Sequence, residues 1–250
     1  MSHNQQKNIL ILGGTGEGMA IAETLSVLPE LRLISSLAGR VANPKLPPGE
    51  VRVGGFGGPD GLAAYLRENK IAGMIDATHP FARRMGWNAA AAAAATGIPL
   101  LRFERPAWAP REGDRWIEVE DWDAAVDILK RSARRVFLAL GRQELAPFTS
   151  LEGVHLVIRS VEPPDESLRF ADAEIVLARG PFKLDDERVL LQSRRIDHLV
   201  CKNSGGGATD AKLQAARELG ITIVMQRRPA RPDVPRVASV ADAVEWVRSL

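Results

Sequence analysis

The chain of 250 residues has one cysteine, Cys201, few aromatic side chains and no excess of either charge. A single cysteine excludes an intramolecular disulfide and a thiolate metal cluster within one chain. Lys and Arg number 33 against 31 Asp and Glu, a net charge of +2, which argues against a nucleic-acid binder carried by bulk charge. No run approaches the roughly 20 apolar residues of a membrane span, and the N-terminus lacks a signal-peptide core. We therefore expect a cytoplasmic protein that binds neither nucleic acid nor membrane.

What the chain does contain is an alternation of short apolar runs and helical patterns. Residues 8–12, NILIL, form a continuous apolar run typical of a strand buried on both faces of a parallel sheet, and a glycine-rich turn and a helical pattern follow. The alternation continues to residue 105 and restarts near residue 135, which predicts βαβ units with right-handed crossovers. We predict an α/β protein with two Rossmann-like, doubly wound parallel-sheet domains.

The two halves of the chain resemble each other. Residues 89–108 align with residues 213–232, since both run from a helix through a glycine into an apolar strand and an Arg-Pro turn. The alignment predicts an N-terminal domain over 1–110, a connecting segment and helix over 111–134, and a C-terminal domain over 135–250. It also makes DATHPFA (76–82) and CKNSGGGAT (201–209) equivalent loops at the carboxyl ends of strands, where open α/β sheets bind ligands.

The glycine-rich turn of residues 13–18, GGTGEG, is the first candidate site. Glycine permits a tight turn and close approach of the backbone to a pyrophosphate, and the following helix offers unpaired N–H groups. The spacing is not a clean GxGxxG, so a purely structural turn remains the alternative. The predicted nucleotide contacts in this turn are Gly13, Gly14, Thr15, Gly16 and Glu17.

The end of the second predicted strand, SSLAGR (35–40), bears on the choice of cofactor. An acid there would bind the ribose 2′-OH of NAD, whereas an arginine accommodates the 2′-phosphate of NADP. The segment has no acid but offers Ser35, Ser36 and Arg40, which favours NADPH, with a surface role for Arg40 as the alternative. The other residues predicted to bind the cofactor are Gly55, Phe56, Asp76 and Thr78.

His79 is the candidate catalytic residue, because its side chain can act as a general acid near neutral pH. Asp76 and Thr78 form a polar cluster with it, and the alternative is a structural role such as helix capping. Pro80 suits the first turn of the next helix, which would place His79 near its N-cap. No second histidine lies at ligand spacing, so we expect no metal.

The segment KNSGGGAT (202–209) offers a cation, short polar donors and glycines at the start of a helix, a composition suited to anions. It lacks the order of a P-loop, and a flexible loop with a capped helix is the alternative. Arg142 is a weaker anion contact. We interpret the basic clusters at 131–135 and 226–232 as solvated positive edges. The tryptophans are expected to pack in cores, with Trp108 and Trp116 as candidate exceptions.

Three segments together resemble the precorrin-6A reductase family of cobalamin biosynthesis: ILILGGTGEG (9–18), DATHPFA (76–82) and residues 202–229. The resemblance covers nearly the whole chain. It implies two Rossmann-like domains with a cleft between them, the N-terminal one binding NADPH and the C-terminal one the substrate. It further implies hydride transfer from NADPH to one double bond of the precorrin-6A macrocycle, giving precorrin-6B. The tetrapyrrole carries many carboxylates, so basic side chains and backbone N–H groups are expected around it.

On this reading the tetrapyrrole is the partner of a monomeric enzyme. The predicted substrate contacts are His79, Pro80, Phe81, Arg142, Lys202, Asn203, Ser204, Gly205, Gly206 and Thr209. Three alternatives stay open: a cobalt-precorrin-6A reductase that uses NADH, a two-lobed nucleotide- or ligand-binding module without catalysis, and a sugar-nucleotide transferase. The transferase would need diphosphate contacts in the second domain that the sequence does not show.

Overall fold

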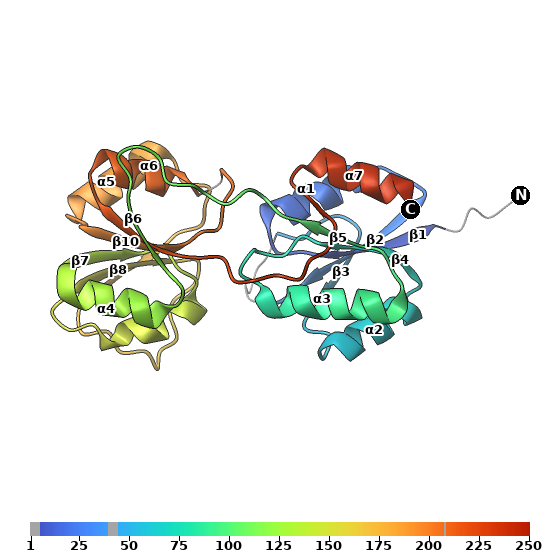
Figure 1. The fold of residues 1–250 in the computed structure, drawn as a ribbon, viewed down its shortest axis with the longest axis horizontal. Helices are drawn as coiled ribbons and strands as arrows, with labels where there is room; N and C mark the ends of the chain where they lie inside the picture. The colour runs from blue at the N-terminus through green and yellow to red at the C-terminus, as the bar shows by residue number, and fades with distance from the viewer. Residues whose placement is uncertain (1–5, 40–44, 208) are drawn as a thin grey trace, which may run out of the picture. The chain divides into compact units, whose positions relative to one another are not determined.

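The computed structural model describes residues 6–39, 45–207 and 209–250, which form two compact units (Figure 1). Unit 1 contains strands β1 (Lys7–Leu12), β2 (Leu31–Leu37), β3 (Glu50–Val53), β4 (Ile71–Asp76), β5 (Leu100–Phe103) and β12 (Arg236–Val237), and helices α1 (Gly16–Leu25), α2 (Pro59–Glu68), α3 (Arg83–Thr96) and α7 (Val240–Ser249). Unit 2 contains strands β6 (Arg115–Val119), β7 (Arg135–Leu138), β8 (His155–Ser160), β9 (Ala173–Leu177), β10 (His198–Lys202) and β11 (Thr222–Gln226), helices α4 (Trp122–Ser132), α5 (Leu184–Ser193) and α6 (Ala211–Glu218), and the 3₁₀ helices η1 (Arg142–Glu144) and η2 (Ala146–Ser150). Within these ranges no helix is long and apolar enough to cross a membrane.

The two sheets share one strand order. Unit 1 has the order β3-β2-β1-β4-β5-β12 and unit 2 the order β9-β8-β7-β10-β11-β6, and neighbouring strands run parallel. With β1 and β7 numbered as strand 1, both sheets have the 3-2-1-4-5-6 order of doubly wound dinucleotide-binding folds, although β6 precedes β7 in the chain. The prediction of two such sheets is confirmed. Strands β4 and β10 occupy the same position, so DATHPFA and CKNSGGGAT follow equivalent strands, as the alignment predicts.

The central strands of each sheet are buried on both faces, which explains why β1, β4 and β10 are largely apolar. In β1, Ile9 and Ile11 belong to the core beneath α1 and α7, whereas Leu10 and Leu12 belong to the core beneath α2 and α3 (Figure 1). The alternation follows from the two-residue period of a strand. Helix α3 is capped at its C-terminus by Gly97, which adopts the left-handed conformation with φ 70° that favours glycine.

The units do not follow the predicted domain boundaries of 1–110, 111–134 and 135–250. Unit 1 ends at Pro106 and resumes over Pro229–Leu250, and unit 2 spans Ala107–Arg228. Strand β6 pairs with β11, so the segment predicted as a connection is part of the second sheet. Strand β12 pairs with β5, which carries the C-terminal segment back to the first sheet. Each unit thus receives its sixth strand and the following helix after a crossing from the other unit.

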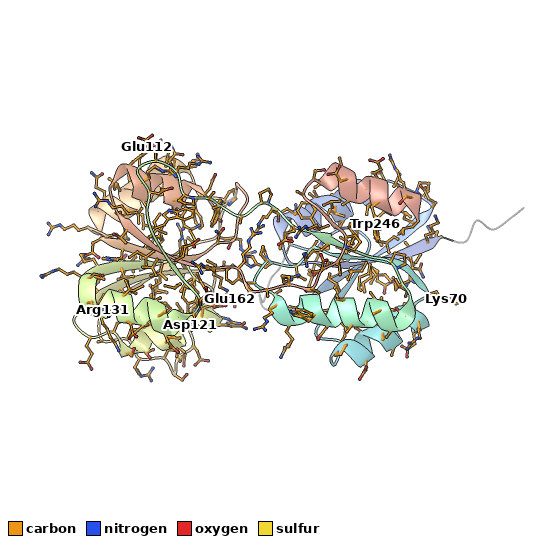
Figure 2. All side chains as sticks on the ribbon, viewed as in Figure 1. Lys70, Glu112, Asp121, Arg131, Glu162 and Trp246 are labelled. Atoms are coloured by element: carbon orange, nitrogen blue, oxygen red, sulfur yellow. The ribbon has the colours of Figure 1, made fainter. Side chains whose placement is uncertain are left out.

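Helix α7 joins unit 1 through close packing against β4. A Cβ on Gly73 would lie 2.4 Å from a methyl carbon of Leu250 and 3.2 Å from the ring of Trp246, a side chain labelled in Figure 2. Ala243, Val244 and Val247 are buried in the same core. The absence of a side chain at Gly73 therefore makes room for the end of the chain.

Candidate functional site

The glycine-rich turn of unit 1 lies between β1 and α1, at the carboxyl edge of the sheet. Gly14 has a φ of 105°, a conformation that favours glycine, and the N–H of Gly13 donates to the carbonyl of Ser36 at 2.9 Å. A Cβ built on Gly14 or on Gly16 would meet nothing within 4 Å. The backbone is therefore open to close approach by a ligand, beside the unpaired N–H groups at the start of α1.

Two of the predicted contacts in this turn are engaged by the protein itself. Thr15 caps α1: its Oγ1 accepts from the N–H of Gly18 at 3.1 Å and donates to the carbonyl of Ala77 at 2.8 Å. Glu17 accepts from Arg105 through both carboxylate oxygens at 2.7 Å. These side chains fix the turn to the ends of β4 and β5 and so shape the site.

The ends of β2 and β3 bring together Ser36, Gly55, Phe56 and an arginine that sequence reasoning missed, Arg52. Its Nη1 donates to Ser36 Oγ at 2.9 Å, its Nη2 donates to the carbonyl of Gly55 at 3.0 Å, and its Cζ lies 3.7 Å from the centre of the Phe56 ring. Ser35 is buried, and its hydroxyl oxygen has no hydrogen-bond partner among the described residues. Arg40 lies outside the described residues. The RxxxF spacing of Arg52 and Phe56 was the one signal for this pair in the sequence.

The DATHPFA loop is built around a buried ion pair. Asp76 Oδ1 accepts from the backbone N–H of Thr78 at 3.1 Å and from its hydroxyl at 2.6 Å, and Asp76 Oδ2 accepts from Arg231 Nη2 at 2.5 Å. The side chains of Arg231 and Asp76 are 6% and 3% exposed. Both oxygens of the carboxylate therefore hold the loop.

His79 follows this ion pair, in a turn before α3. The N–H of Ala82 donates to the carbonyl of His79 at 2.7 Å, and the N–H of Phe81 donates to His79 Nδ1 at 3.2 Å. Helix α3 begins at Arg83 with Ala82 as its N-cap, so the prediction of His79 near the N-cap and Pro80 in the first turn is wrong. Proline equally suits the second position of a β-turn, and that geometry delays the helix here.

The basic cluster at 226–232 is not a solvated edge throughout. Arg227 is exposed, but Arg231 also donates to the carbonyls of His79 at 3.3 Å and Pro80 at 3.2 Å. Arg228 donates to the carbonyls of Asn203 at 2.9 Å and Ser204 at 3.0 Å. The prediction is therefore wrong for these two arginines, because each satisfies carbonyls of a loop distant in sequence. In the cluster at 131–135, Arg131 and Arg134 are exposed as predicted.

In unit 2, the loop after β10 is held by Trp108. The backbone N–H of Trp108 donates to Asn203 Oδ1 and the Asn203 amide donates to the carbonyl of Trp108, both at 2.9 Å, while Trp108 Nε1 donates to the carbonyl of Gly206 at 2.9 Å. Gly205 and Gly206 have φ of 69° and 74°. The Asn203 side chain is thus used inside the protein, and α6 begins only at Ala211, beyond the predicted anion loop.

The predicted cations of unit 2 have acidic partners. Lys202 pairs with Glu144, and Arg142, on η1, pairs with Glu162 at 3.0 Å (Glu162 is labelled in Figure 2). A further cation missed in the sequence, Lys212, is buried, donates to the carbonyl of Thr209 at 2.5 Å and lies 4.7 Å from the Trp108 ring. Burial lowers the pKa of Lys212. Trp116, like Trp108, packs against the core that contains the buried apolar residues of α6, and its buried Nε1 has no hydrogen-bond partner in the described ranges.

The structure therefore groups the predicted residues by unit. The glycine turn, the serines of β2, Gly55, Phe56 and the DATHPFA loop all lie at the carboxyl edge of the unit 1 sheet, the edge at which doubly wound folds bind ligands. In unit 2, Lys202 ends the equivalent strand, and residues 203–207 follow it. Arg52, Arg231 and Lys212 were missed, because their partners are set by tertiary contacts.

Comparisons with known proteins give one consistent result. The model of the precorrin-6x reductase CbiJ/CobK family matches residues 8–248. A precorrin-6A reductase of Rhodococcus erythropolis is 49% identical over 97% of this chain and 98% of its own length. A cobalt-precorrin-6A reductase of Priestia megaterium is 30% identical over 88% of this chain and 90% of its own. A solved structure, CobK precorrin-6A reductase, superposes with a TM-score of 0.91 at 42% identity, covering 98% of this chain and 97% of that one.

Proposed function

Since the chain belongs to the precorrin-6x reductase CbiJ/CobK family, we propose that it is a precorrin-6A reductase, which reduces one double bond of the precorrin-6A macrocycle with NADPH to give precorrin-6B. The observation that carries the proposal is the 49% identity over 97% of the chain to a precorrin-6A reductase. The lower identity of 30% to a cobalt-precorrin-6A reductase supports the metal-free ring as substrate.

The cofactor is assigned to unit 1 because its residues fit a dinucleotide. Open backbone at Gly14 and Gly16 and the N-terminus of α1 suit the pyrophosphate, and Ser36 with Arg52 suits an adenosine carrying a 2′-phosphate. NADPH, when bound, supplies the hydride. The task of the chain is then to orient the reactants and exclude water.

His79 is proposed as the residue of the DATHPFA loop that contacts the substrate. Because Nδ1 accepts from the N–H of Phe81, the proton of a neutral ring resides on Nε2, which makes Nε2–H a hydrogen-bond donor. Arg231 and Asp76 fix the backbone that carries this ring. In unit 2, backbone N–H groups of the loop after β10 are proposed to meet substrate carboxylates, whereas Lys202 and Arg142 are engaged by Glu144 and Glu162.

Anaerobic incubation of the protein with precorrin-6A and either NADPH or NADH tests the proposal. We expect the ring and nicotinamide absorbances to change together with NADPH, and neither to change without the tetrapyrrole. In the same assay His79→Ala should lower turnover while NADPH affinity stays normal. Turnover of cobalt-precorrin-6A with NADH alone would instead favour the cobalt-ring alternative, and binding without turnover of either ring would favour a ligand-binding module.

A further inference from the structure

Arg52 is held in one orientation at the end of β3. Its Nη1 donates to Ser36 Oγ at 2.9 Å and to the carbonyl of Gly54 at 3.0 Å, and its Nη2 donates to the carbonyl of Gly55 at 3.0 Å. The guanidinium also lies over the Phe56 ring, with Cζ 3.7 Å from the ring centre. A fork fixed in this way loses little side-chain entropy when it takes a further acceptor.

The positive charge of Arg52 has no acidic partner in the described part of the chain. All of its hydrogen bonds go to neutral oxygens, and the nearby Glu50 is paired with Arg32. Tyr65 does not supply a negative charge, because the pKa of its phenol is raised, mainly by burial and to a smaller extent by the charge of Glu50. A fixed, partly buried guanidinium without a counter-ion is an anion-binding group.

Unit 2 contains the same kind of stack with its counter-ion built in. Arg159, at the end of β8, lies 3.6 Å from the ring centre of Phe182, in the loop after β9 that corresponds to the loop of Phe56 after β3. There the guanidinium forms a buried, bidentate pair with Glu187 on α5. Among the described residues of unit 1, no carboxylate pairs with Arg52, so its charge is left for a ligand to neutralise.

The position of Arg52 indicates which anion this is. Ser36 ends β2, the strand whose end meets the adenosine ribose in dinucleotide-binding folds, and Ser36 Oγ accepts from Arg52 and so keeps its own proton to donate. We propose that Arg52, together with Ser36, binds the 2′-phosphate of the cofactor and thereby selects NADPH over NADH. This inference rests on the proposed function of unit 1 and moves the role predicted for Arg40 to Arg52.

Calorimetric binding to the full chain tests the assignment without any need for turnover. The ligands are NADPH, NADH, adenosine 2′,5′-bisphosphate and 5′-AMP, and the variants are Arg52→Gln and Arg52→Lys. Loss of a hydrogen-bonded charge predicts that Arg52→Gln weakens NADPH and the bisphosphate about 10- to 100-fold. NADH and 5′-AMP should bind as before. Arg52→Lys should keep part of the preference, since it keeps the charge but not the fork.

Arg67→Gln, which removes an exposed arginine near the end of α2 that donates to the carbonyl of Ala95, is the matched control and should leave all four affinities unchanged. Equal losses of NADPH and NADH in the Arg52 variants would overturn the assignment, as would a preference for NADPH that Arg40→Ala abolishes and Arg52→Gln leaves intact. If the wild-type protein binds NADPH but does not reduce precorrin-6A, the proposed function fails, yet the bisphosphate comparison still decides the role of Arg52.

Discussion

Units 1 and 2 build the same six-stranded sheet, yet they differ in how charge is neutralised at its carboxyl edge. In unit 2, Arg159 pairs with Glu187 inside the protein, and Arg142 and Lys202 pair with Glu162 and Glu144. In unit 1, the hydrogen bonds of Arg52 to the described residues all go to neutral oxygens. The difference teaches that a shared strand order does not make two equivalent ligand sites, because the site depends on which charges the protein leaves for a ligand to neutralise.

The turns after β1 and β7, which occupy the same position in the two sheets, also differ. After β1, glycines with open space above them lead into the ten-residue helix α1. After β7, residues 139–141 (ALG) lead into η1, a 3₁₀ helix of only three residues. A short 3₁₀ segment aligns few peptide dipoles, and unit 2 therefore lacks the helix N-terminus that favours a pyrophosphate.

The largest effect is expected from breaking the buried ion pair of Arg159 and Glu187 in unit 2. Glu187→Gln leaves the guanidinium of Arg159 buried without a counter-ion and should destabilise the protein by about 3–5 kcal/mol. Urea unfolding followed by tryptophan fluorescence would measure the loss, with Trp108, Trp116 and Trp122 reporting on unit 2.

The matched control replaces both partners with apolar side chains. Arg159→Met combined with Glu187→Leu should recover most of the stability, since no buried charge is left unpaired. Arg52→Gln, which removes a charge left unpaired by the described residues of unit 1, should lower the free energy of unfolding far less than Glu187→Gln does. A similar loss from Glu187→Gln and Arg52→Gln would contradict the distinction between the two units.

An effect of intermediate size concerns the DATHPFA loop after β4, which Arg231 holds in unit 1. In unit 1, a Cβ on Gly86 would lie 2.5 Å from Arg231 Nε, so Gly86→Ala should displace the arginine from Asp76 and cost about 1–3 kcal/mol through overpacking. Precorrin-6A turnover should fall as well, because the carbonyl of His79 loses its hydrogen bond from Arg231. Asn88→Ala on the same helix serves as the control, and equal stability of the two variants would show that Arg231 does not need this space.

The smallest effect is a pH dependence specific to unit 2. Burial, aided by the charge of Arg159, lowers the pKa of Lys212 below its ordinary value of 10.5. At a pH between the lowered pKa of Lys212 in the folded protein and the ordinary value of 10.5 in the unfolded chain, the unfolded chain binds more protons. The free energy of unfolding of the wild type should therefore rise with pH over this interval, by about 1.4 kcal/mol for each unit by which the pKa is lowered. Lys212→Met removes this dependence. The free energies of unfolding of this variant at pH 7 and at pH 10 should therefore lie closer together than those of the wild type. A difference in stability between the two proteins that does not change with pH would contradict the lowered pKa.

Much of unit 1 could be predicted from local sequence because its signals are local. The apolar run before the glycine turn identifies β1, and Gly97 marks the end of α3, since both depend on backbone conformation and on burial over a few residues. The two-residue strand β12 gave no such signal, and which sheet edge it joins depends on packing of α7 against Gly73. That is why the predicted boundary at 135–250 failed.

In the candidate site, the sequence by itself determined the strand ends, the open glycine turn and the DATHPFA and KNSGGGAT loops, because apolar periodicity and glycine conformation are properties of neighbouring residues. Only the tertiary structure decided which polar side chains remain for a ligand. Asp76 is used by Arg231, 155 residues away, Asn203 by Trp108, 95 residues away, and Lys202 by Glu144, whereas Arg52 keeps its charge. Charges and hydrogen bonds are satisfied by whatever the fold brings near, irrespective of distance along the chain.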